Sequence, residues 1–214
     1  MVTGIYTPHG GEITLTVKGK KERLKGLKPN QVTAKGIART FQNIRLFPNM
    51  SVLENVMIGR HTKSGSGILG ALLRDRKTVR EEKEIVEKCY GLLKKIGLQA
   101  HVNELAMNLP YGAQRRLEIA RALATEPALL LLDEPAAGMN HKETRDLDAL
   151  ILEIRQTEKI AILLIEHDMR LVMRVSDRIY VMEYGRGVAC GAPKEIQKNP
   201  IVIRAYLGEE RPDA

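Results

Sequence analysis

Two adjacent carboxylates, Asp133 and Glu134, directly follow the four leucines at residues 129–132. A short continuous aliphatic run is typical of a fully buried strand of a parallel sheet. The carboxylates then lie at the carboxyl end of that strand, where open α/β sheets bind their ligands. The first carboxylate can hold a hydrated Mg²⁺, and the second can position a water for attack on a phosphate. The alternative is a strand that merely ends in acidic residues and caps the next helix, and this motif alone does not decide.

A second polar tip follows the next aliphatic run. Residues 160–165 predict another buried strand, and Glu166, His167 and Asp168 come directly after it. A histidine at the carboxyl end of a strand can donate a hydrogen bond to a γ-phosphate. The simpler interpretation is a satisfied histidine near the surface. With a polar helix predicted over about 142–156 between the two strands, the alternation is typical of a parallel α/β sheet.

The elements that must position these tips follow from the spacing of apolar residues. Between residues 79 and 96, apolar residues recur with the helical period and charged residues fill the other face, which predicts an amphipathic helix. A second helix is predicted after residues 108–112, ending near Thr125. The shorter predicted elements are a strand over 11–17, a helix over 31–39, a helix over 52–58, and a hairpin joining 180–182 to 187–189 with its turn at 184–185, while 63–67 is the most flexible-looking segment.

The composition excludes some classes of function. Aromatic residues make up 4% of the 214 residues and tryptophan is absent, so a platform that stacks bases on aromatic rings is not expected. The net charge is +8, and much of the surplus lies in residues 18–28. Because no nucleic-acid-binding fold accompanies this run, a solvated hairpin or loop explains it better than a nucleic-acid patch. We therefore expect no nucleic-acid partner.

Length and apolar runs limit the architecture. A chain of 214 residues predicts one domain, or one with a small appendage. The longest apolar runs, 128–132 and 160–165, are far shorter than the ~20 residues that span a bilayer, and the first residues carry no secretory signal. We expect a soluble, cytoplasmic chain that docks onto a membrane protein. Cys89 and Cys190 are interpreted as reduced packing residues.

Five segments of the chain, in order, resemble the nucleotide-binding subunit of ATP-binding-cassette (ABC) transporters. In that family they correspond to the Q-loop, the signature motif with its helix, the Walker B acids, the D-loop and the H-loop: Gln42 within 38–43, residues 109–114 followed by 115–123, Asp133 with Glu134, residues 137–140, and His167. Five ordered motifs are far more specific than one. The resemblance implies an α/β fold of the ABC-type P-loop NTPase class, with a parallel sheet core and a helical signature subdomain inserted over about residues 50–125.

The resemblance also implies cofactors and roles. ATP and Mg²⁺ are the implied cofactors, with Glu134 and His167 catalytic and with Asp133 and Gln42 as metal ligands. The implied cofactor-binding residues are Gln42, Leu109, Pro110, Tyr111, Gly112, Ala113, Gln114 and Asn140. A glutamine is long and neutral enough to touch Mg²⁺ or an attacking water, and a helix N-terminus favours phosphate. The simpler interpretations are a loop glutamine bonded to backbone and an ordinary amphipathic core helix.

Three further segments point to one branch of the family. Residues 36–48, 165–169 and 199–208 resemble the ATPases of branched-chain amino-acid importers, most closely the LivG type. In such systems two homologous ATPase subunits, as a hetero- or homodimer, drive two membrane permease subunits that a periplasmic solute-binding protein feeds. The resemblance implies a cytoplasmic location at the inner face of the cell membrane. It also implies a hydrophobic amino acid or a related small amide as the solute.

The chain departs from the family at several places. The phosphate-gripping Walker A loop, G-x-x-x-x-G-K-[S/T], is absent, so we expect residues 1–214 to be a single incomplete domain that lacks the Walker A strand, loop and helix. Each lost charge-assisted hydrogen bond is worth ~1.5–3 kcal/mol, so we expect weak ATP binding and an inactive chain. Pro110 and Ala113 also replace a serine and a glutamine or glycine of the signature, and His141 replaces a common proline. The alternative function is a non-catalytic remnant that binds or regulates the permease.

Overall fold

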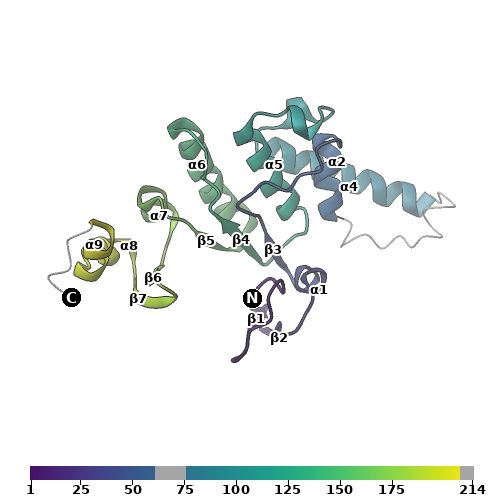
Figure 1. Cartoon of the computed structure of the whole chain (residues 1–214). Coiled ribbons are helices and arrows are strands. Elements are labelled where there is room, and N and C mark those ends of the chain that lie inside the picture. The colour runs from purple at the N-terminus through teal and green to yellow at the C-terminus, as the bar shows by residue number, and fades with distance from the viewer. Residues whose placement is uncertain (61–75, 208–214) are drawn as a thin grey trace.

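A three-stranded parallel sheet forms the centre of the computed structural model, which describes residues 1–60 and 76–207 (Figure 1). Its strands are β3 (Ile37–Arg39), β4 (Leu129–Asp133) and β5 (Ala161–Ile165), in that order. Both pairs are parallel, with Leu131 opposite Arg39 on one side and opposite Leu163 on the other. The carboxyl ends of all three strands therefore meet at one edge, which brings together the polar residues that follow each strand.

Strand β3 corrects the helix predicted over residues 31–39. The helix, α1 (Pro29–Ala34), is shorter, and Gly36 follows it at a φ of +97°, in the left-handed region that glycine adopts without a steric cost. The Gly36 carbonyl then accepts hydrogen bonds from the backbone N–H groups of Ala128 and Leu129, at 2.8 and 3.1 Å. Ile37 and Ala38 are buried in the sheet. Tertiary pairing and burial thus override the local helical pattern.

Two helices cover one face of the sheet and bury the even-numbered leucines of β4. Helices α5 (Tyr111–Leu123) and α6 (His141–Glu158) share one apolar core with Leu130 and Leu132. Helices α2 (Val52–Arg60) and α4 (Arg76–Lys95) pack beside α5, and the short η2 (Gln99–His101) and η3 (Ala106–Asn108) precede it (Figure 1). The helices predicted near 52–58, 79–96, 113–125 and 142–156 are therefore confirmed. A helical subdomain over about 50–125 stays a prediction.

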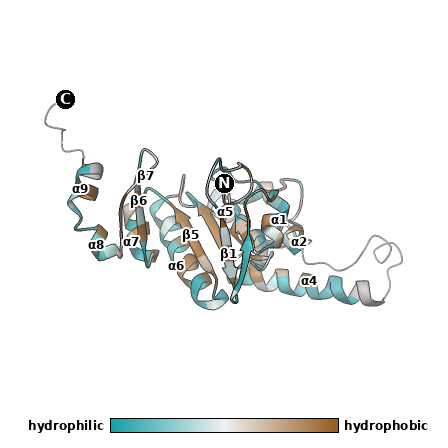
Figure 2. Ribbon diagram, turned by 90° about the horizontal axis from the view of Figure 1, so that it is seen from below, coloured by the Kyte–Doolittle hydropathy of each residue, from teal (hydrophilic) through white to brown (hydrophobic). Residues whose placement is uncertain are grey.

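The opposite face of the sheet is covered only in part. The hairpin of β1 (Thr14–Val17) and β2 (Lys20–Arg23), followed by α1, packs a small cluster against β3 and β4. On β5, Leu163 and Ile165 are 47% and 56% exposed, and Figure 2 shows this strand as a hydrophobic stripe. The prediction of a buried strand is therefore wrong for β5: one face is exposed because the hairpin cluster does not include this edge, and Ile162 and Leu164 on the other face are only partly buried.

The C-terminal segment has an apolar core of its own. It comprises α7 (Met169–Val175), β6 (Ile179–Glu183), β7 (Arg186–Gly191), α8 (Pro193–Ile196) and α9 (Pro200–Leu207). In Figure 1 these elements extend to the side of β5 away from the N-terminal hairpin. Strands β6 and β7 are antiparallel, and their turn at Tyr184 and Gly185 has positive φ values of 46° and 78°. This confirms the predicted hairpin.

The basic run near the N-terminus forms the solvated hairpin that the sequence indicates. Lys18 and Gly19 make its turn, with φ values of 48° and 78°. Glu22 pairs with both Lys20 and Lys35, at 2.9 and 2.8 Å. No described helix is long and apolar enough to cross a membrane. The segment 63–67, predicted to be flexible, lies outside the described residues.

Both cysteines are free, but only one is a packing residue. Cys89 on α4 is fully buried in the main core, as predicted. Cys190 on β7 is exposed, and its sulfur accepts a hydrogen bond of 3.2 Å from Nε of Arg178. The prediction for Cys190 is therefore wrong, because β7 lies in a two-stranded sheet whose strands each turn one face to solvent.

Candidate functional site

The polar residues that follow the three central strands converge as the parallel sheet requires. The side-chain amide of Gln42, beyond β3, donates a hydrogen bond of 3.0 Å to Oε2 of Glu134, beyond β4. Nδ1 of His167, beyond β5, lies 3.9 Å from the same carboxylate oxygen. At the end of β4, Oδ2 of Asp133 lies 2.6 Å from Nη2 of Arg39. The structure thus brings Glu134 and His167, which follow predicted strands, together with Gln42, which only the family resemblance singled out, and it places Asp133 at the end of β4 next to Glu134.

Backbone geometry separates the two neighbouring carboxylates. Asp133 is the last residue of β4, whereas Glu134 has a φ of 44°, in the left-handed region that few residues other than glycine adopt. The N–H of Glu134 donates a hydrogen bond of 2.9 Å to the carbonyl of Ile165, which anchors this turn to the end of β5. As a result, Asp133 faces a guanidinium, while Glu134 faces an amide and an imidazole.

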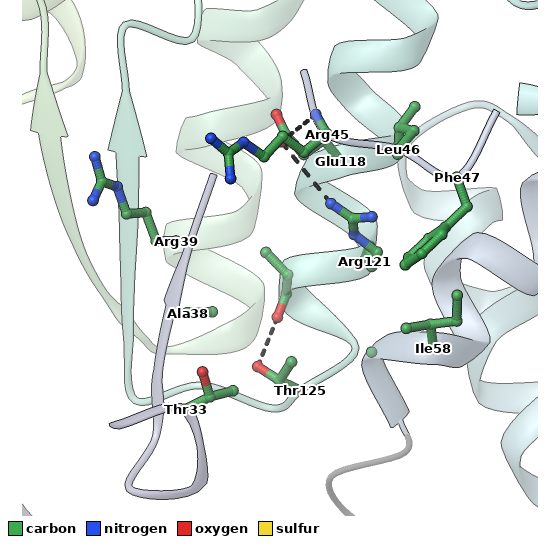
Figure 3. A pocket seen from close by; sticks show the side chains of 12 residues that line it. Thr33, Ala38, Arg39, Arg45, Leu46, Phe47, Ile58, Glu118, Arg121 and Thr125 are labelled. Atoms are coloured by element: carbon green, nitrogen blue, oxygen red, sulfur yellow. Dashed lines mark hydrogen bonds and ion pairs between the residues drawn. The ribbon is translucent and has the colours of Figure 1, made fainter. Parts of the chain in front are cut away.

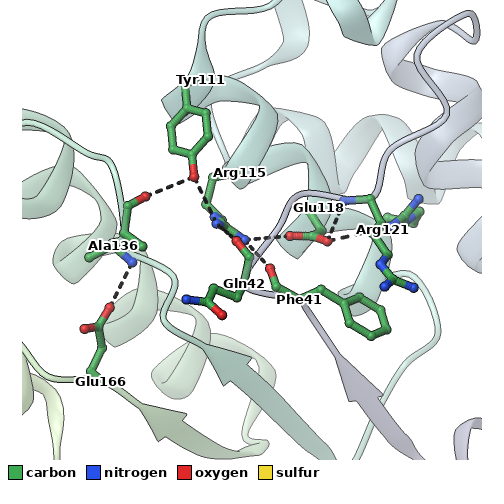
Figure 4. Close-up of polar contacts among 10 residues, drawn as sticks. Phe41, Gln42, Tyr111, Arg115, Glu118, Arg121, Ala136 and Glu166 are labelled. Carbon is green, nitrogen blue, oxygen red and sulfur yellow. Dashed lines mark hydrogen bonds and ion pairs between the residues drawn. The ribbon is translucent and has the colours of Figure 1, made fainter. Parts of the chain in front are cut away.

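A buried glutamate that the sequence analysis gave no role fixes the two loops beside the site. The side chain of Glu166 is 1% exposed. One of its carboxylate oxygens accepts a hydrogen bond of 3.0 Å from the N–H of Ala136 (Figure 4). The other accepts one of 3.0 Å from the N–H of His167. Hydrogen bonds to a carboxylate are among the stronger ones in proteins. Glu166 therefore holds the loop after β4 against the loop after β5.

Arg39 is a second residue whose role the sequence analysis missed. Its guanidinium contacts Asp133, donates to Oγ1 of Thr3 at 3.3 Å, and lies 5.2 Å from the centre of the Phe41 ring. The sequence analysis had no signal for it, because residues 31–39 were predicted to form a helix and the strand was not recognised. Arg39 pairs with Leu131, and Asp133 lies two residues further along the same face. An arginine at the end of the neighbouring parallel strand is therefore placed within reach of Asp133.

The predicted signature residues divide into buried and exposed positions. Leu109 and Ala113 belong to the main core, and Gly112 is buried beside α6. A Cβ atom at Gly112 would lie 2.7 Å from Oε1 of Glu143. The side-chain amide of Gln114 donates a hydrogen bond of 2.9 Å back to the carbonyl of Leu109. The motif thus forms the start of α5 mainly through packing.

The exposed signature positions are Pro110 and Tyr111. Pro110 precedes the first residue of α5 and provides no side-chain cap. The hydroxyl of Tyr111 donates a hydrogen bond of 3.0 Å to the carbonyl of Ala137, in the loop after Glu134. Asn140 ends this loop, and its side-chain oxygen accepts hydrogen bonds from the N–H groups of Lys142 and Glu143, which caps α6. Cofactor binding by Pro110, Tyr111 and Asn140 stays a prediction.

A cavity of about 480 Å³ opens beside Arg39, bounded by β3, α2 and α5 (Figure 3). Arg39, Arg45 and Arg121 are among its lining residues, and in Figure 3 the side chain of Arg39 points away from Arg121. Burial lowers the pKa of Arg121, and the nearby carboxylate of Glu118 opposes this shift. Glu118 also lines the cavity, where it lies 4.0 Å from Arg121, and it pairs with the buried Arg115 at 2.9 Å. Arg39 in turn pairs with Asp133. Three basic residues against one acidic residue in the lining favour an anion.

The site residues fit a metal that arrives with a phosphate ligand. Among the described residues, no three His, Cys, Asp or Glu side chains form a cluster that could hold a metal ion. The available oxygen donors are the carboxylate of Asp133 and the side-chain amide of Gln42. Mg²⁺ is usually held by one or two carboxylates together with substrate phosphates. This donor set therefore suits the Mg²⁺ of a nucleotide complex, and the cation would compete with Arg39 for Asp133.

A parallel α/β sheet with polar residues at its strand ends fits the nucleotide-binding subunit that the sequence resembles, and comparison with known proteins shows the family. The family model described as "ABC transporter" matches residues 1–137, and the one described as "Branched-chain amino acid ATP-binding cassette transporter" matches residues 188–212. The chain belongs to the ABC transporter family. It has the ABC ATPase fold, an α/β fold with a parallel sheet.

Several similar curated proteins are branched-chain amino acid transport ATP-binding proteins. The chain is 50% identical over 208 residues to the high-affinity branched-chain amino acid transport ATP-binding protein LivG of Salmonella typhimurium, covering 97% of this chain and 80% of the relative. It is 49% identical to LivG of Escherichia coli and 45% identical to BraF of Pseudomonas aeruginosa over the same shares. The chain is LivG-like at the level of sequence.

Solved structures agree with the family assignment. The ADP conformation of an ATP-binding cassette of an ABC transporter matches with a TM-score of 0.77 and 31% identity, covering 97% of this chain and 81% of the other. A nucleotide-free ATP-binding cassette from an ABC transporter matches with a TM-score of 0.75 and 29% identity, over the same shares. The resemblance inferred from five motifs is thereby confirmed at the level of fold and family.

Proposed function

We propose that the chain is the ATP-binding subunit of an ABC importer for branched-chain or other hydrophobic amino acids, and that Gln42, Asp133, Glu134 and His167 form its nucleotide site. The observation that carries this proposal is the 3.0 Å hydrogen bond from Gln42 to Glu134, with His167 3.9 Å from the same oxygen. Three separate strands supply these groups, and Asp133 lies beside them. Half-identity to LivG proteins supports the choice of solute class.

Each side chain has a task that its environment suits. Asp133 and Gln42 would hold Mg²⁺, which when bound neutralises phosphate charge. Glu134 positions the attacking water and accepts its proton, and the Gln42 amide orients the carboxylate for this task. His167 is 74% exposed, so its ring can donate to a γ-phosphate that enters from solvent. The positive cavity beside Arg39 adds attraction for the nucleotide.

The proposed partners follow from the family. A homologous ATPase subunit completes the pair, two permease subunits cross the membrane, and a periplasmic binding protein delivers the solute. The chain then works at the inner face of the membrane. The 214 residues contain no G-x-x-x-x-G-K-[S/T] segment, so they supply no phosphate-cradling amides or lysine of that kind. We therefore expect these residues by themselves to bind MgATP weakly and to hydrolyse it no faster than background.

The first experiment tests the metal-dependent part of binding. A fluorescent ATP analogue is titrated into the purified chain with and without Mg²⁺. Asp133→Ala should abolish the Mg²⁺-dependent gain in affinity, because it removes the only carboxylate assigned to the metal. Asp146→Ala, at an exposed position of α6, is the matched control and should retain that gain. Equal loss in both variants, or no loss in either, would refute the site.

The second experiment tests turnover. ATP hydrolysis is measured for the chain, for Glu134→Gln and for Glu153→Gln, which changes an exposed glutamate of α6. Turnover above background that Glu134→Gln lowers by about 100-fold or more, and Glu153→Gln does not, would support the site and contradict the expected impairment. Background rates in all three variants would agree with that impairment.

A non-catalytic permease-binding module is the second candidate function. The proline at position 110, which has neither a backbone N–H nor a hydroxyl to donate, favours it. Co-purification with a co-expressed permease pair distinguishes the two functions. If the chain is a non-catalytic module, its association with the permease pair should be unchanged by ATP and by Asp133→Ala. If it is the ATP-binding subunit, nucleotide should alter that association.

A further inference from the structure

A fully buried arginine lies behind the proposed site and donates to four acceptors. The side chain of Arg115, on the first turns of α5, is 0% exposed. Its Nη1 donates to the carbonyl of Phe41 at 2.6 Å and to Oε2 of Glu118 at 2.9 Å. Its Nη2 donates to the carbonyl of Gln42 at 2.6 Å and to the hydroxyl of Tyr111 at 3.2 Å (Figure 4). One planar guanidinium thus uses both of its terminal nitrogens twice.

These contacts connect two loops of the site that are far apart in the sequence. On one side, Arg115 holds the backbone of Gln42, whose side-chain amide donates to Glu134. On the other side, Arg115 donates to Tyr111, whose hydroxyl donates to the carbonyl of Ala137. Figure 4 shows Tyr111 and Arg115 between the Gln42 loop and the loop that carries Ala136. The guanidinium therefore connects the Gln42 loop, whose side chain contacts Glu134, with the loop that follows Glu134 in the chain.

The Gln42 loop depends on this bridge because its own backbone provides little support. Within the described part of the chain, no hydrogen bond is found from the backbone N–H groups of residues 41–44. The flanking N–H groups are held, since Thr40 donates to the carbonyl of Leu131 and Arg45 donates to Glu118. Between them, the carbonyls of Phe41 and Gln42 are fixed by Arg115. A lysine ammonium lacks the rigid fork that reaches both carbonyls and Glu118 together.

We propose that Arg115 is a positioning residue that holds Gln42 against Glu134 in the absence of nucleotide. Through its hydrogen bond to Tyr111, Arg115 also fixes the loop of residues 135–139. The functional meaning of this inference rests on the roles proposed above for Gln42 and Glu134. Preorganised groups lower the reorganisation that a reaction requires. A shift of Arg115 would displace both loops, so this buried guanidinium couples their positions.

The test measures backbone order in the full chain by ¹⁵N relaxation, without nucleotide. We expect order parameters of about 0.85 at Gln42 and Ala137, as in rigid backbone. Arg115→Lys should lower the value at Gln42 to below about 0.6 while α5 stays ordered. Arg116→Lys, the neighbouring arginine on α5, is the matched control and should change neither site. Tyr111→Phe removes only the hydroxyl and should loosen Ala137 while leaving Gln42 ordered.

Each outcome decides the inference. An unchanged value at Gln42 in folded Arg115→Lys overturns it, and so does an equal change in Arg116→Lys or a uniform loss of order along α5, which would mark a purely structural role. If Arg115→Lys does not fold, the wild-type chain and Tyr111→Phe decide. An order parameter below about 0.6 at Gln42 in the wild-type chain overturns the inference. A rigid Gln42 in the wild-type chain, together with a loss of order at Ala137 alone in Tyr111→Phe, supports it. Because the relaxation measurements contain no nucleotide, they do not depend on MgATP binding. Failure to bind MgATP would therefore refute the proposed function without affecting the test of Arg115.

Discussion

Asp133 and Glu134 are neighbours in the chain, yet the structure gives them different surroundings. Successive side chains of a strand point to opposite faces, and the positive φ of Glu134 turns the chain as soon as β4 ends. Asp133 is left beside a guanidinium, so a Mg²⁺ ion must compete with Arg39 for it. Glu134 is left beside an amide that donates to it. A metal ligand and a water-positioning group can therefore be adjacent residues without sharing a task.

The two thiols should differ sharply in reactivity. Burial raises the pKa of Cys89 to about 11, an effect that the charge of Arg60 opposes, while Cys190 is exposed. At pH 8 roughly one Cys89 thiol in a thousand would be ionised, and the reagent cannot reach it. With an aromatic disulfide reagent we expect one equivalent to react within minutes and the second only on unfolding. Cys190→Ser should abolish the fast phase, and a fast phase that persists would contradict the assignment.

At the scale of elements, the contact between α2 and α5 depends on a glycine. A Cβ atom at Gly59 would lie 2.3 Å from the backbone carbonyl oxygen of Arg121 and 2.9 Å from Cβ of Ala124. Backbone atoms cannot rotate away, so any side chain at position 59 must push the two helices apart. Arg115 and the buried signature residues Gly112 and Ala113 are on α5, so this crossing helps to set where α5 lies relative to the site.

Gly59→Ala should therefore destabilise the protein although alanine is the better helix former. We expect a loss of roughly 1–3 kcal/mol in the free energy of unfolding, the usual range for overpacking. Gly91→Ala is the matched control, because this glycine of α4 is exposed and a Cβ atom there meets nothing within 4 Å. It should stabilise by about 0.5–1 kcal/mol. Urea denaturation measures both, and a stabilising Gly59→Ala would show that the helices are not in close contact there.

Sequence patterns located the elements that carry a long periodic apolar pattern or that end in distinctive polar residues. The helices around Cys89 and Leu117 and the strands before Asp133 and Glu166 were predictable because one face or one run is strongly apolar. Strand β3 was not, since three residues carry too little pattern and its stability comes from pairing with β4. For the site, strand ends gave Asp133, Glu134 and His167, whereas Gln42 came from the family resemblance alone. Arg115 was hidden because a charged residue on a helix is ordinarily solvated, and its burial depends on carbonyls 73 and 74 positions away.

At the scale of the whole molecule, α7 joins two apolar cores. Leu171 and Val175 belong to the main core with α6, whereas Met169, Val172 and Met173 pack on the C-terminal core of β6, β7, α8 and α9. Few polar contacts assist this connection. Arg174 pairs with the carboxylate of Asp148 on α6, and Arg155 of α6 pairs with Asp177 at 2.9 Å. The C-terminal segment is therefore held mainly by one face of a short helix.

This arrangement predicts that the C-terminal segment opens before the central sheet does. Leu171 is fully buried, so Leu171→Ala should cost roughly 2–5 kcal/mol at that contact. Ile201→Ala, which truncates a 47% exposed side chain of α9, is the control and should cost less than about 0.5 kcal/mol. By hydrogen exchange with mass spectrometry, amides of β6 and β7 should exchange at least about tenfold faster in Leu171→Ala, with a much smaller change in β4 and β5. An equal acceleration in all four strands would mean that the two cores unfold as one cooperative unit, and that α7 transmits stability between them instead of acting as their weak point.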